Sequence, residues 1–352
     1  MKEKLNITSL TPLLINIMYV KLLLAVPRNI ILAAGSGAWI LCIYVTLIEL
    51  LLFFLISKVY DFSKNLMDIK GGSVKKVIGV LATVFLVLSM SSVVKIYPET
   101  VKIILLKNTP TEIIYIIFSV AAIIGAYMGI ESLGKICSLF QPIALFVMVL
   151  CFLFLIPNMH LYNLTPVLGK GIKGITLDGL TILSVFSDIF LVFLIAPYGE
   201  DRKKIKRAGY KSIIIMGIIL TTAMLGYSMI FPYDVSEDFV LPLYNTVRLI
   251  QLSDFFGRFE AFFEFVWSIS VLIYLSVYLY ALSFVWKEAF GLKYKNPLIA
   301  PFMCFVALLS YSSVSYIEQN RNFTIYSGIL IGTGFIVPII AQLIRNREEK
   351  RI

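Results

Sequence analysis

The chain has 352 residues, a mean hydropathy of +0.90, 59% hydrophobic residues and only 15% charged residues. A soluble domain carries about 25% charged residues and about 45–50% apolar residues. This composition therefore excludes a soluble enzyme, a disordered protein and a disulfide-rich scaffold. The formal net charge is +10, but the basic residues lie in short clusters between apolar runs. That pattern is typical of the loops of a membrane protein, and it accounts for the charge without any nucleic acid as partner.

The apolar runs are long enough to cross a bilayer, which takes about 20 residues each. They predict ten spans, at residues 7–26, 38–57, 77–94, 112–130, 136–156, 175–196, 212–231, 261–286, 297–316 and 324–344. The third run is expected to continue as a helix past Pro98 to about Leu106. Between the seventh and eighth runs, an amphipathic stretch around Leu241–Leu252 predicts a helix lying along the membrane surface. The sequence thus predicts an all-α integral membrane protein with a single transmembrane domain over residues 1–352.

The distribution of basic residues predicts the orientation of the chain. With ten spans, 21 of the 31 Lys and Arg residues fall on the side of the two termini and nine on the other side. The positive-inside rule then places both termini in the cytoplasm. A basic cytoplasmic face is also expected to attract anionic lipids. Its densest cluster, Arg202–Lys211, is interpreted as an orientation signal and lipid contact, or alternatively as a docking surface for a partner protein.

Motifs for catalysis and cofactor binding are absent from the sequence. It contains no GxxxxGK[ST], HExxH or GxSxG pattern, and the glycine-rich segment Gly169–Gly174 lies in a loop between spans. The single histidine, His160, and four cysteines without CxxC spacing indicate no metal site and no disulfide framework. We therefore expect no enzyme, no catalytic residue, no metal and no cofactor.

The informative residues are ionisable groups inside apolar spans, namely Lys21, Glu49, Asp188 and Glu264. A charge at the bilayer centre costs at least about 2.5 kcal/mol, so such residues usually face a cavity or one another. The alternative is that they only hold helices together. Counted as five plus five spans, with repeat one at about 7–156 and repeat two at about 175–344, Lys21 and Asp188 lie in the first helix of each half.

Both of these helices look interrupted. The first meets Pro27 soon after Lys21, and the sixth carries Ser184 and Ser187 before Asp188. Paired interrupted helices in two halves indicate an inverted-repeat transporter fold, in which the unwound segments face a ligand at the bilayer midplane. We predict that Lys21 and Asp188 form an ion pair there. The alternatives are that Lys21 extends outward along its helix, or that it contacts Glu49 or Glu264.

A ligand cavity is predicted between spans one, three, six and eight. Phe85 with Ser89, and Tyr274 with Tyr278, are each spaced i, i+4 and so share a helical face. Helix packing is the alternative for these aromatic residues, although a buried tyrosine hydroxyl needs a partner that a ligand can supply. The predicted lining residues are Val20, Lys21, Leu22, Phe85, Ser89, Phe186, Ser187, Asp188, Tyr274 and Tyr278.

Three stretches of the chain carry a resemblance to a known family. They are Leu13–Arg28 with its ending LLLAVPR, Gly129–Lys135 followed by Phe140-Gln141-Pro142, and the run from Leu241 to Trp267. The chain resembles the B subunit of Ger-type nutrient germinant receptors, the spore germination permease family within the amino acid–polyamine–organocation superfamily. The resemblance implies a ten-helix LeuT-like fold in the inner spore membrane with interrupted helices 1 and 6. It also implies a complex with a larger membrane-bound A subunit and a lipoprotein C subunit.

The same resemblance implies sensing of a small nutrient ligand, commonly an amino acid, without net transport. The family usually has glycines in the first helix where this chain has Val20, Lys21 and Leu22, and a Gly-Glu pair where it has Ser187-Asp188. An amino acid/proton symporter and a pore-like scaffold with a vestigial ligand site are the alternatives. Fold alone does not separate these functions, because function is determined by the site.

Overall fold

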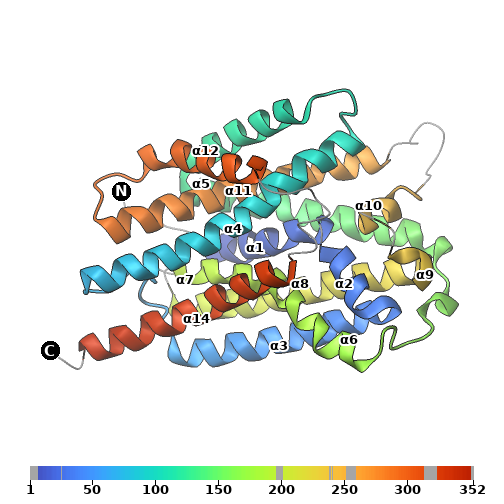
Figure 1. The fold of residues 1–352 in the computed structure, drawn as a ribbon, viewed down its shortest axis with the longest axis horizontal. Coiled ribbons are helices and arrows are strands. Elements are labelled where there is room, and N and C mark those ends of the chain that lie inside the picture. The colour runs from blue at the N-terminus through green and yellow to red at the C-terminus, as the bar shows by residue number, and fades with distance from the viewer. Residues whose placement is uncertain are drawn as a thin grey trace.

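The computed structural model describes residues 7–24, 26–195, 201–237, 239, 241–250, 259–312 and 323–349. Within these ranges the chain forms α-helices and 3₁₀ segments and contains no β-strand. Most of the long helices run side by side along the longest axis of the molecule (Figure 1).

Nineteen elements follow one another in the described part of the chain. Up to residue 155 they are α1 (Ile7–Tyr19), η1 (Val20–Leu23), α2 (Val26–Ala34), η2 (Gly35–Gly37), α3 (Ala38–Val59), α4 (Gly72–Ile104) and α5 (Thr111–Leu155). They continue as η3 (Ile156–Asn158), η4 (Leu161–Leu164), α6 (Ile172–Thr176), η5 (Asp178–Phe190), α7 (Leu191–Ile195) and α8 (Arg202–Ile230). The last are α9 (Tyr233–Ser236), α10 (Pro242–Val247), α11 (Phe259–Phe290), η7 (Asn296–Leu298), α12 (Ile299–Ser312) and α14 (Phe323–Glu349).

The helices identify a multi-pass membrane protein. Seven stretches are long and apolar enough to cross a bilayer, and Asn296–Tyr311 is a shorter apolar helix. The seven are Val26–Val59, Gly72–Ile104, Thr111–Asn158, Ile172–Leu194, Arg202–Ile230, Phe259–Phe290 and Ile325–Glu348. The predicted ten spans are reached when α1 and α12 are counted and Thr111–Asn158 is divided in two. The number ten therefore stays a prediction.

Helix α5 changes direction at Gly129. This glycine has φ 83° and ψ 164°, a conformation outside the helical region that residues with a Cβ rarely adopt. A Cβ placed on Gly125 would lie 3.8 Å from Leu133 Cδ2. Eight residues of straight helix would advance about 12 Å, so the chain folds back at this point. The predicted spans 112–130 and 136–156 are thus two helical segments that meet at one glycine, without the intervening loop that the sequence suggested.

Two further expectations concern helix length. Helix α4 continues past Pro98 to Ile104, as predicted. The amphipathic stretch around Leu241–Leu252 forms only the six-residue α10, while residues 251–252 lie outside the described part of the chain. Within α10, Leu243 and Val247 are buried, and the helix contacts α8 and α11. Its apolar face is therefore packed against the bundle, and its position along a membrane surface stays a prediction.

Helix α11 forms the centre of the bundle. It has almost no polar face, and 83% of its most apolar 18-residue window is buried. A helix that is hydrophobic on all sides is normally surrounded by other elements, and α11 packs against α4, α5, α12, α1 and η1. The same helix carries Tyr274 and Tyr278, so two predicted site residues lie in the middle of the core.

At one end of the bundle, the C-terminal turns of α14 hold the loop between α3 and α4 (residues 60–71). Arg345 donates from Nη2 to the Asn65 carbonyl at 2.7 Å. The Glu348 carboxylate accepts the backbone N–H groups of Lys70 and Gly71 at 3.0 and 2.9 Å. The loop is also attached to α7, because the Leu66 N–H bonds the Phe193 carbonyl at 3.1 Å. This loop therefore closes the end of the bundle beneath the η5–α7 segment.

Candidate ligand-binding site

The first and sixth predicted spans are both interrupted, as the sequence indicates. Helix α1 gives way at Val20 to the 3₁₀ segment η1, and Leu24 follows with φ −88° and ψ −135°, outside the helical region. The sixth span is 3₁₀ over the 13 residues of η5. Runs of 3₁₀ helix beyond about 3–4 residues are uncommon and often mark a hinge or a site under strain. The two breaks therefore single out the part of the fold where backbone and side chains are available to a ligand.

A buried ion pair joins the two breaks. The Lys21 Nζ atom on η1 lies 2.7 Å from Asp188 Oδ1 on η5, and it lies 3.5 Å from the Ser184 carbonyl oxygen. Lys21 is 7% exposed and Asp188 is fully buried. The predicted pair is confirmed, and the alternative in which Lys21 extends outward is wrong for this conformation. The contact compensates both charges. Either charge buried without its partner would destabilise the packing of η1 against η5.

Tyrosines of α11 complete the cluster and connect it to α4. The Tyr278 hydroxyl donates to Asp188 Oδ1 at 2.5 Å. The Tyr274 ring stacks on that of Tyr278 with 4.3 Å between centroids, and the Tyr274 hydroxyl donates to the Ser89 carbonyl at 3.2 Å. Elements from the first, third, sixth and eighth predicted spans thus meet in one place, through residues the sequence selected.

The other predicted lining residues lie around this cluster with fewer polar contacts. The Phe85 ring packs against that of Phe190 at 4.6 Å between centroids. A Cβ placed on Gly334 of α14 would lie 3.3 Å from the Ser187 carbonyl oxygen and 3.5 Å from Phe85 Cε2. The remaining three predicted lining residues are fully buried, namely Val20, Leu22 and Phe186. The structure is therefore closed around the cluster, and the role of these residues as ligand contacts stays a prediction.

The predicted lining residues did not include three residues that the structure brings into this region. Ser184 accepts from Lys21 through its carbonyl, Phe190 contacts Phe85, and Gly334 allows α14 to approach η5. Ser184 lies one helical turn before Asp188. Gly334 follows two other glycines in an apolar run, a pattern typical of close helix approach in membranes. Those two signals are present in the sequence, whereas nothing distinguishes Phe190 from its apolar neighbours.

Two polar atoms in the cluster have no hydrogen-bond partner among the described residues. They are Asp188 Oδ2 and the Ser89 hydroxyl, and both residues are fully buried. Buried polar atoms are normally hydrogen-bonded. One carboxylate oxygen and one hydroxyl are therefore available to a polar ligand, beside a lysine ammonium that can bind an anionic group.

The other two ionisable residues predicted within spans lie apart from this cluster. Glu49 on α3 is fully buried, and neither of its carboxylate oxygens has a hydrogen-bond partner within the described ranges. Glu264 on α11 lies beside Tyr97, whose hydroxyl is 2.5 Å from that of Ser268. Among the described ion pairs, Lys21 pairs with Asp188 and contacts neither glutamate.

Comparisons with known proteins agree with this architecture. The family model described as "Spore germination protein" matches residues 4–324. Three Bacillus subtilis (strain 168) proteins are similar to the chain. Spore germination protein KB is 24% identical over 299 residues, covering 82% of this chain and 80% of that protein. Spore germination protein B2 is 22% identical over 328 residues, with coverages of 90% and 87%, and spore germination protein A2 is 24% identical over 331 residues, with coverages of 90% and 89%.

A solved structure shares the fold. It is a nucleobase–cation–symport-1 family transporter in a closed conformation with bromovinylhydantoin bound. The TM-score is 0.65 at 10% sequence identity, and the alignment covers 97% of this chain and 92% of the transporter. This similarity supports a LeuT-like transporter fold with interrupted first and sixth helices. At 10% identity it carries no information about the ligand.

Proposed function

Because the chain belongs to the spore germination protein family, with a germinant receptor or permease-like role in a membrane, we propose that it is the nutrient-sensing subunit of a germinant receptor. The proposed ligand is an amino acid bound between spans one, three, six and eight. The observation that carries the proposal is the Lys21–Asp188 pair at the two helix breaks, with Asp188 Oδ2 and the Ser89 hydroxyl unpartnered among the described residues.

The charges of this cluster match those of a zwitterion. An amino acid can place its carboxylate on the Lys21 ammonium and its own ammonium on Asp188, so that two ion pairs replace one. Charge-assisted hydrogen bonds of this kind are about twice as strong as those between neutral groups. The Tyr278 hydroxyl holds Asp188 from the α11 side and fixes the direction of its free oxygen. A neutral solute inserted between Lys21 and Asp188 would leave both charges uncompensated, and a singly charged solute would leave one.

A symporter for an amino acid and a proton is the second candidate function. Similarity to a transporter fold favours it, and Glu49 and Glu264 are buried carboxyl groups that a proton pathway would need. Titration calorimetry of the purified chain with a panel of L-amino acids, together with uptake of the labelled amino acids into proteoliposomes, separates the functions. Binding without uptake supports sensing, whereas uptake driven by a proton gradient supports a symporter. If neither binding nor uptake is observed, a pore-like scaffold with a vestigial site remains, and the proposal is contradicted.

The Tyr278→Phe variant tests the site by removing a single hydroxyl group. It removes the hydroxyl that donates to Asp188 Oδ1, and a hydrogen bond to a charged group contributes about 1.5–3 kcal/mol. We expect amino-acid affinity to fall by about tenfold or more in calorimetry. Tyr280→Phe is the matched control, because its hydroxyl on the same helix binds the Lys295 ammonium and lies outside the cluster. Equal affinity of Tyr278→Phe and the unaltered chain would contradict the proposed site.

The partners proposed for the chain are a larger membrane-bound A subunit and a lipoprotein C subunit in the inner spore membrane. Both ends of the described chain lie at the same end of the bundle, because Ser212 of α8 bonds the Thr11 carbonyl and Asp61 contacts both Arg202 and Gln342. This arrangement fits two termini in the cytoplasm. The basic cluster at the beginning of α8 lies at that end as well.

Charge reversal of this basic cluster tests the contact with the A subunit. Lys203, Arg207 and Lys211 are exposed and spaced i, i+4, i+8, so they form one stripe on α8. We expect the triple change to glutamate to deplete the A subunit from spore membranes in an immunoblot, because the stripe would no longer attract acidic patches. The control is Lys107→Glu with Lys173→Glu, at exposed positions on the opposite predicted side. Unchanged A-subunit levels, with the variant chain still inserted, would leave only binding of anionic lipids for this cluster.

A further inference from the structure

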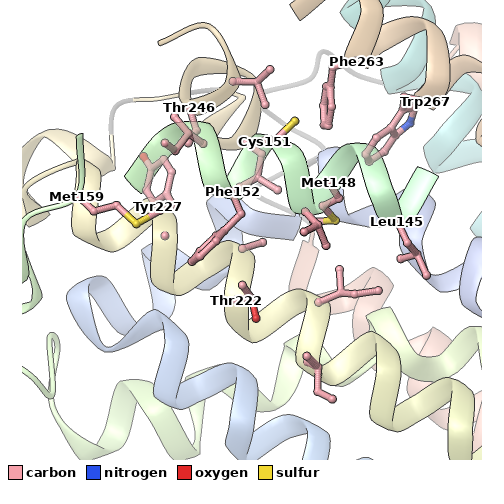
Figure 2. Close-up of a pocket in the computed structure, with 18 of the residues that line it drawn as sticks. Leu145, Met148, Cys151, Phe152, Met159, Thr222, Tyr227, Thr246, Phe263 and Trp267 are labelled. Carbon is pink, nitrogen blue, oxygen red and sulfur yellow. The ribbon is translucent and has the colours of Figure 1, made fainter. Parts of the chain in front are cut away.

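A cavity lies away from the Lys21 cluster, between the later part of α5, α8, α10 and α11 (Figure 2). Its volume is about 330 Å³. Pockets for small molecules in proteins span about 300–1,000 Å³, so the space is sufficient for a ligand. Among its lining residues is Trp267, part of the stretch that carried the strongest sequence motif and that the proposed nutrient site does not use.

The cavity lining is elongated along α8. Along α8 its wall extends from Ile215 to Tyr227, which at 1.5 Å per residue is about 18 Å. Figure 2 shows Met159, Tyr227 and Thr246 toward one end and Leu145 and Trp267 toward the other. A cavity lining of this extent accommodates an extended hydrocarbon chain.

The wall offers few hydrogen-bonding groups, of which the Trp267 Nε1–H has no hydrogen-bond partner among the described residues. Most of the lining side chains are aliphatic or aromatic, and the hydroxyl groups at one end are already bonded within the protein. The Tyr227 hydroxyl donates to the Ser236 carbonyl at 2.8 Å, and Thr246 donates to the Pro242 carbonyl at 3.0 Å. A ligand with several polar groups would lose most of its hydration without compensation here, because burying an unpaired polar group costs about 1–3 kcal/mol. An apolar chain meets no such penalty.

The mouth of the cavity opens toward lipid. Val149 on α5 and Ile218 on α8 line it and are 56% and 61% exposed. Both belong to stretches that cross the membrane. An apolar surface exposed at that depth contacts bilayer hydrocarbon instead of water. Acyl chains of membrane lipids are therefore the apolar molecules that surround the opening.

From these observations we propose that this slot, defined by the residues of α5, α8, α10 and α11 named above, binds one acyl chain of a membrane lipid. The acyl chain enters between Val149 and Ile218, and the polar end of the lipid lies toward α10, at the Ile230 end of α8. That end is remote from the basic Arg202 end, so the lipid belongs to the leaflet opposite the basic cluster. Binding of this acyl chain does not depend on the proposed nutrient site.

The slot shares a wall with the first helix break. The Trp267 ring packs on that of Tyr19 with 5.2 Å between centroids, and Tyr19 is the last residue of α1 before η1. The Asn16 amide also donates to the Ser270 carbonyl at 3.1 Å. An acyl chain in the slot would thus contact Trp267, which packs on Tyr19. The segment η1, which carries Lys21, begins directly after Tyr19.

Quenching of Trp267 fluorescence by brominated lipid tests the proposal. The chain has three tryptophans, so Trp39→Phe with Trp286→Phe leaves Trp267 as the reporter. The full chain is placed in phosphatidylethanolamine–phosphatidylglycerol vesicles that contain a rising share of phosphatidylglycerol brominated in mid-chain. Trp267 is 2% exposed, so bromine in bulk lipid reaches it poorly. We expect quenching that saturates at a low share of brominated lipid, as for a binding site.

A variant whose side chain fills the slot is compared with the unfilled protein. Ala223 lines the cavity, and Ala223→Phe places a ring in it. Ile214→Phe, at a 46% exposed position on the same helix outside the lining, is the control. We expect Ala223→Phe to lose more than half of the quenching and Ile214→Phe to keep it. Quenching that rises linearly with the brominated share, or that is absent, would overturn the proposal. Equal quenching in both variants would also overturn it. Should Ala223→Phe fail to fold in a thermal unfolding assay, the saturation curve of the unfilled slot still decides the outcome.

Discussion

Replacing Lys21 by methionine is expected to destabilise the folded protein by about 3–5 kcal/mol, because it leaves the buried Asp188 carboxylate without its ammonium partner. Asp188→Asn should destabilise it similarly, since the Lys21 ammonium then loses its counter-charge. Both effects follow from a 2.7 Å contact between side chains that are 9% and 0% exposed. The measurement is equilibrium unfolding of the purified chain in detergent, with the nutrient response of spores carrying each variant as a second readout. Either single change should abolish that response.

The charge-swapped double variant distinguishes a specific pair from general sensitivity of the site. Lys21→Asp with Asp188→Lys restores opposite charges at the same two positions, so part of the lost stability should return. The exposed pair Lys135–Glu131, at 2.8 Å and i, i+4 spacing, is a matched control. Pairs of that kind contribute about 0.3–0.5 kcal/mol, and Lys135→Met should change stability by no more than that. If the swap recovers nothing beyond the single variants, the ion pair does not organise the two breaks.

Arg345→Met is expected to open the end of the bundle that the α3–α4 loop closes. The Arg345 guanidinium donates to the Asn65 carbonyl and, at 3.1 Å, to the Gln342 side chain, while Gln342 also accepts from the Asp61 N–H. Hydrogen bonds from a charged group contribute about 1.5–3 kcal/mol. Loss of these contacts should therefore raise the population of the released loop by about tenfold or more.

Cysteine labelling measures that release. Met67 is fully buried in the loop, so Met67→Cys reports its opening when Cys304, the one exposed cysteine among the described residues, is changed to serine. In this background we expect Arg345→Met to increase the rate at which an impermeant maleimide labels the introduced thiol in inside-out vesicles by about tenfold. Arg347→Met is the control, because Arg347 is exposed two residues further along α14. Equal labelling in both variants would show that the Arg345 contacts do not hold the loop.

The parts of the structure predicted from sequence are those for which the membrane leaves few alternatives. Lys21 and Asp188 are detectable because ionisable residues inside apolar spans are rare and costly, and the serines near Asp188 mark the second break. The ion pair follows from the corresponding positions of the two residues in two halves of the chain. Tyr274 and Tyr278 share a face by spacing alone, and the structure confirms their contact with each other and with the pair.

What sequence reasoning missed depends on contacts between distant segments. Gly129 begins a stretch that carries the family resemblance, but the sequence predicted a loop after residue 130, and only packing of α5 on its neighbours places the change of direction at this one glycine. The apolar face of the short α10 is buried by α8 and α11, which hydropathy along one segment does not reveal. The approach of α14 to η5 at Gly334 likewise depends on how two helices far apart in sequence are packed.

The pairing of one ammonium with one carboxylate makes the Lys21–Asp188 pair electrically neutral, and this determines how the pair interacts with the membrane potential. Moving a single elementary charge through the membrane field changes the free energy by about 2.3 kcal/mol per 100 mV. A neutral pair that shifts as a unit, or that exchanges its partners for the two ends of a zwitterion, carries no net charge through that field. If the chain binds a zwitterion as proposed, binding would move no net charge through that field, and we expect the affinity to be the same in a polarised membrane and in one without any potential.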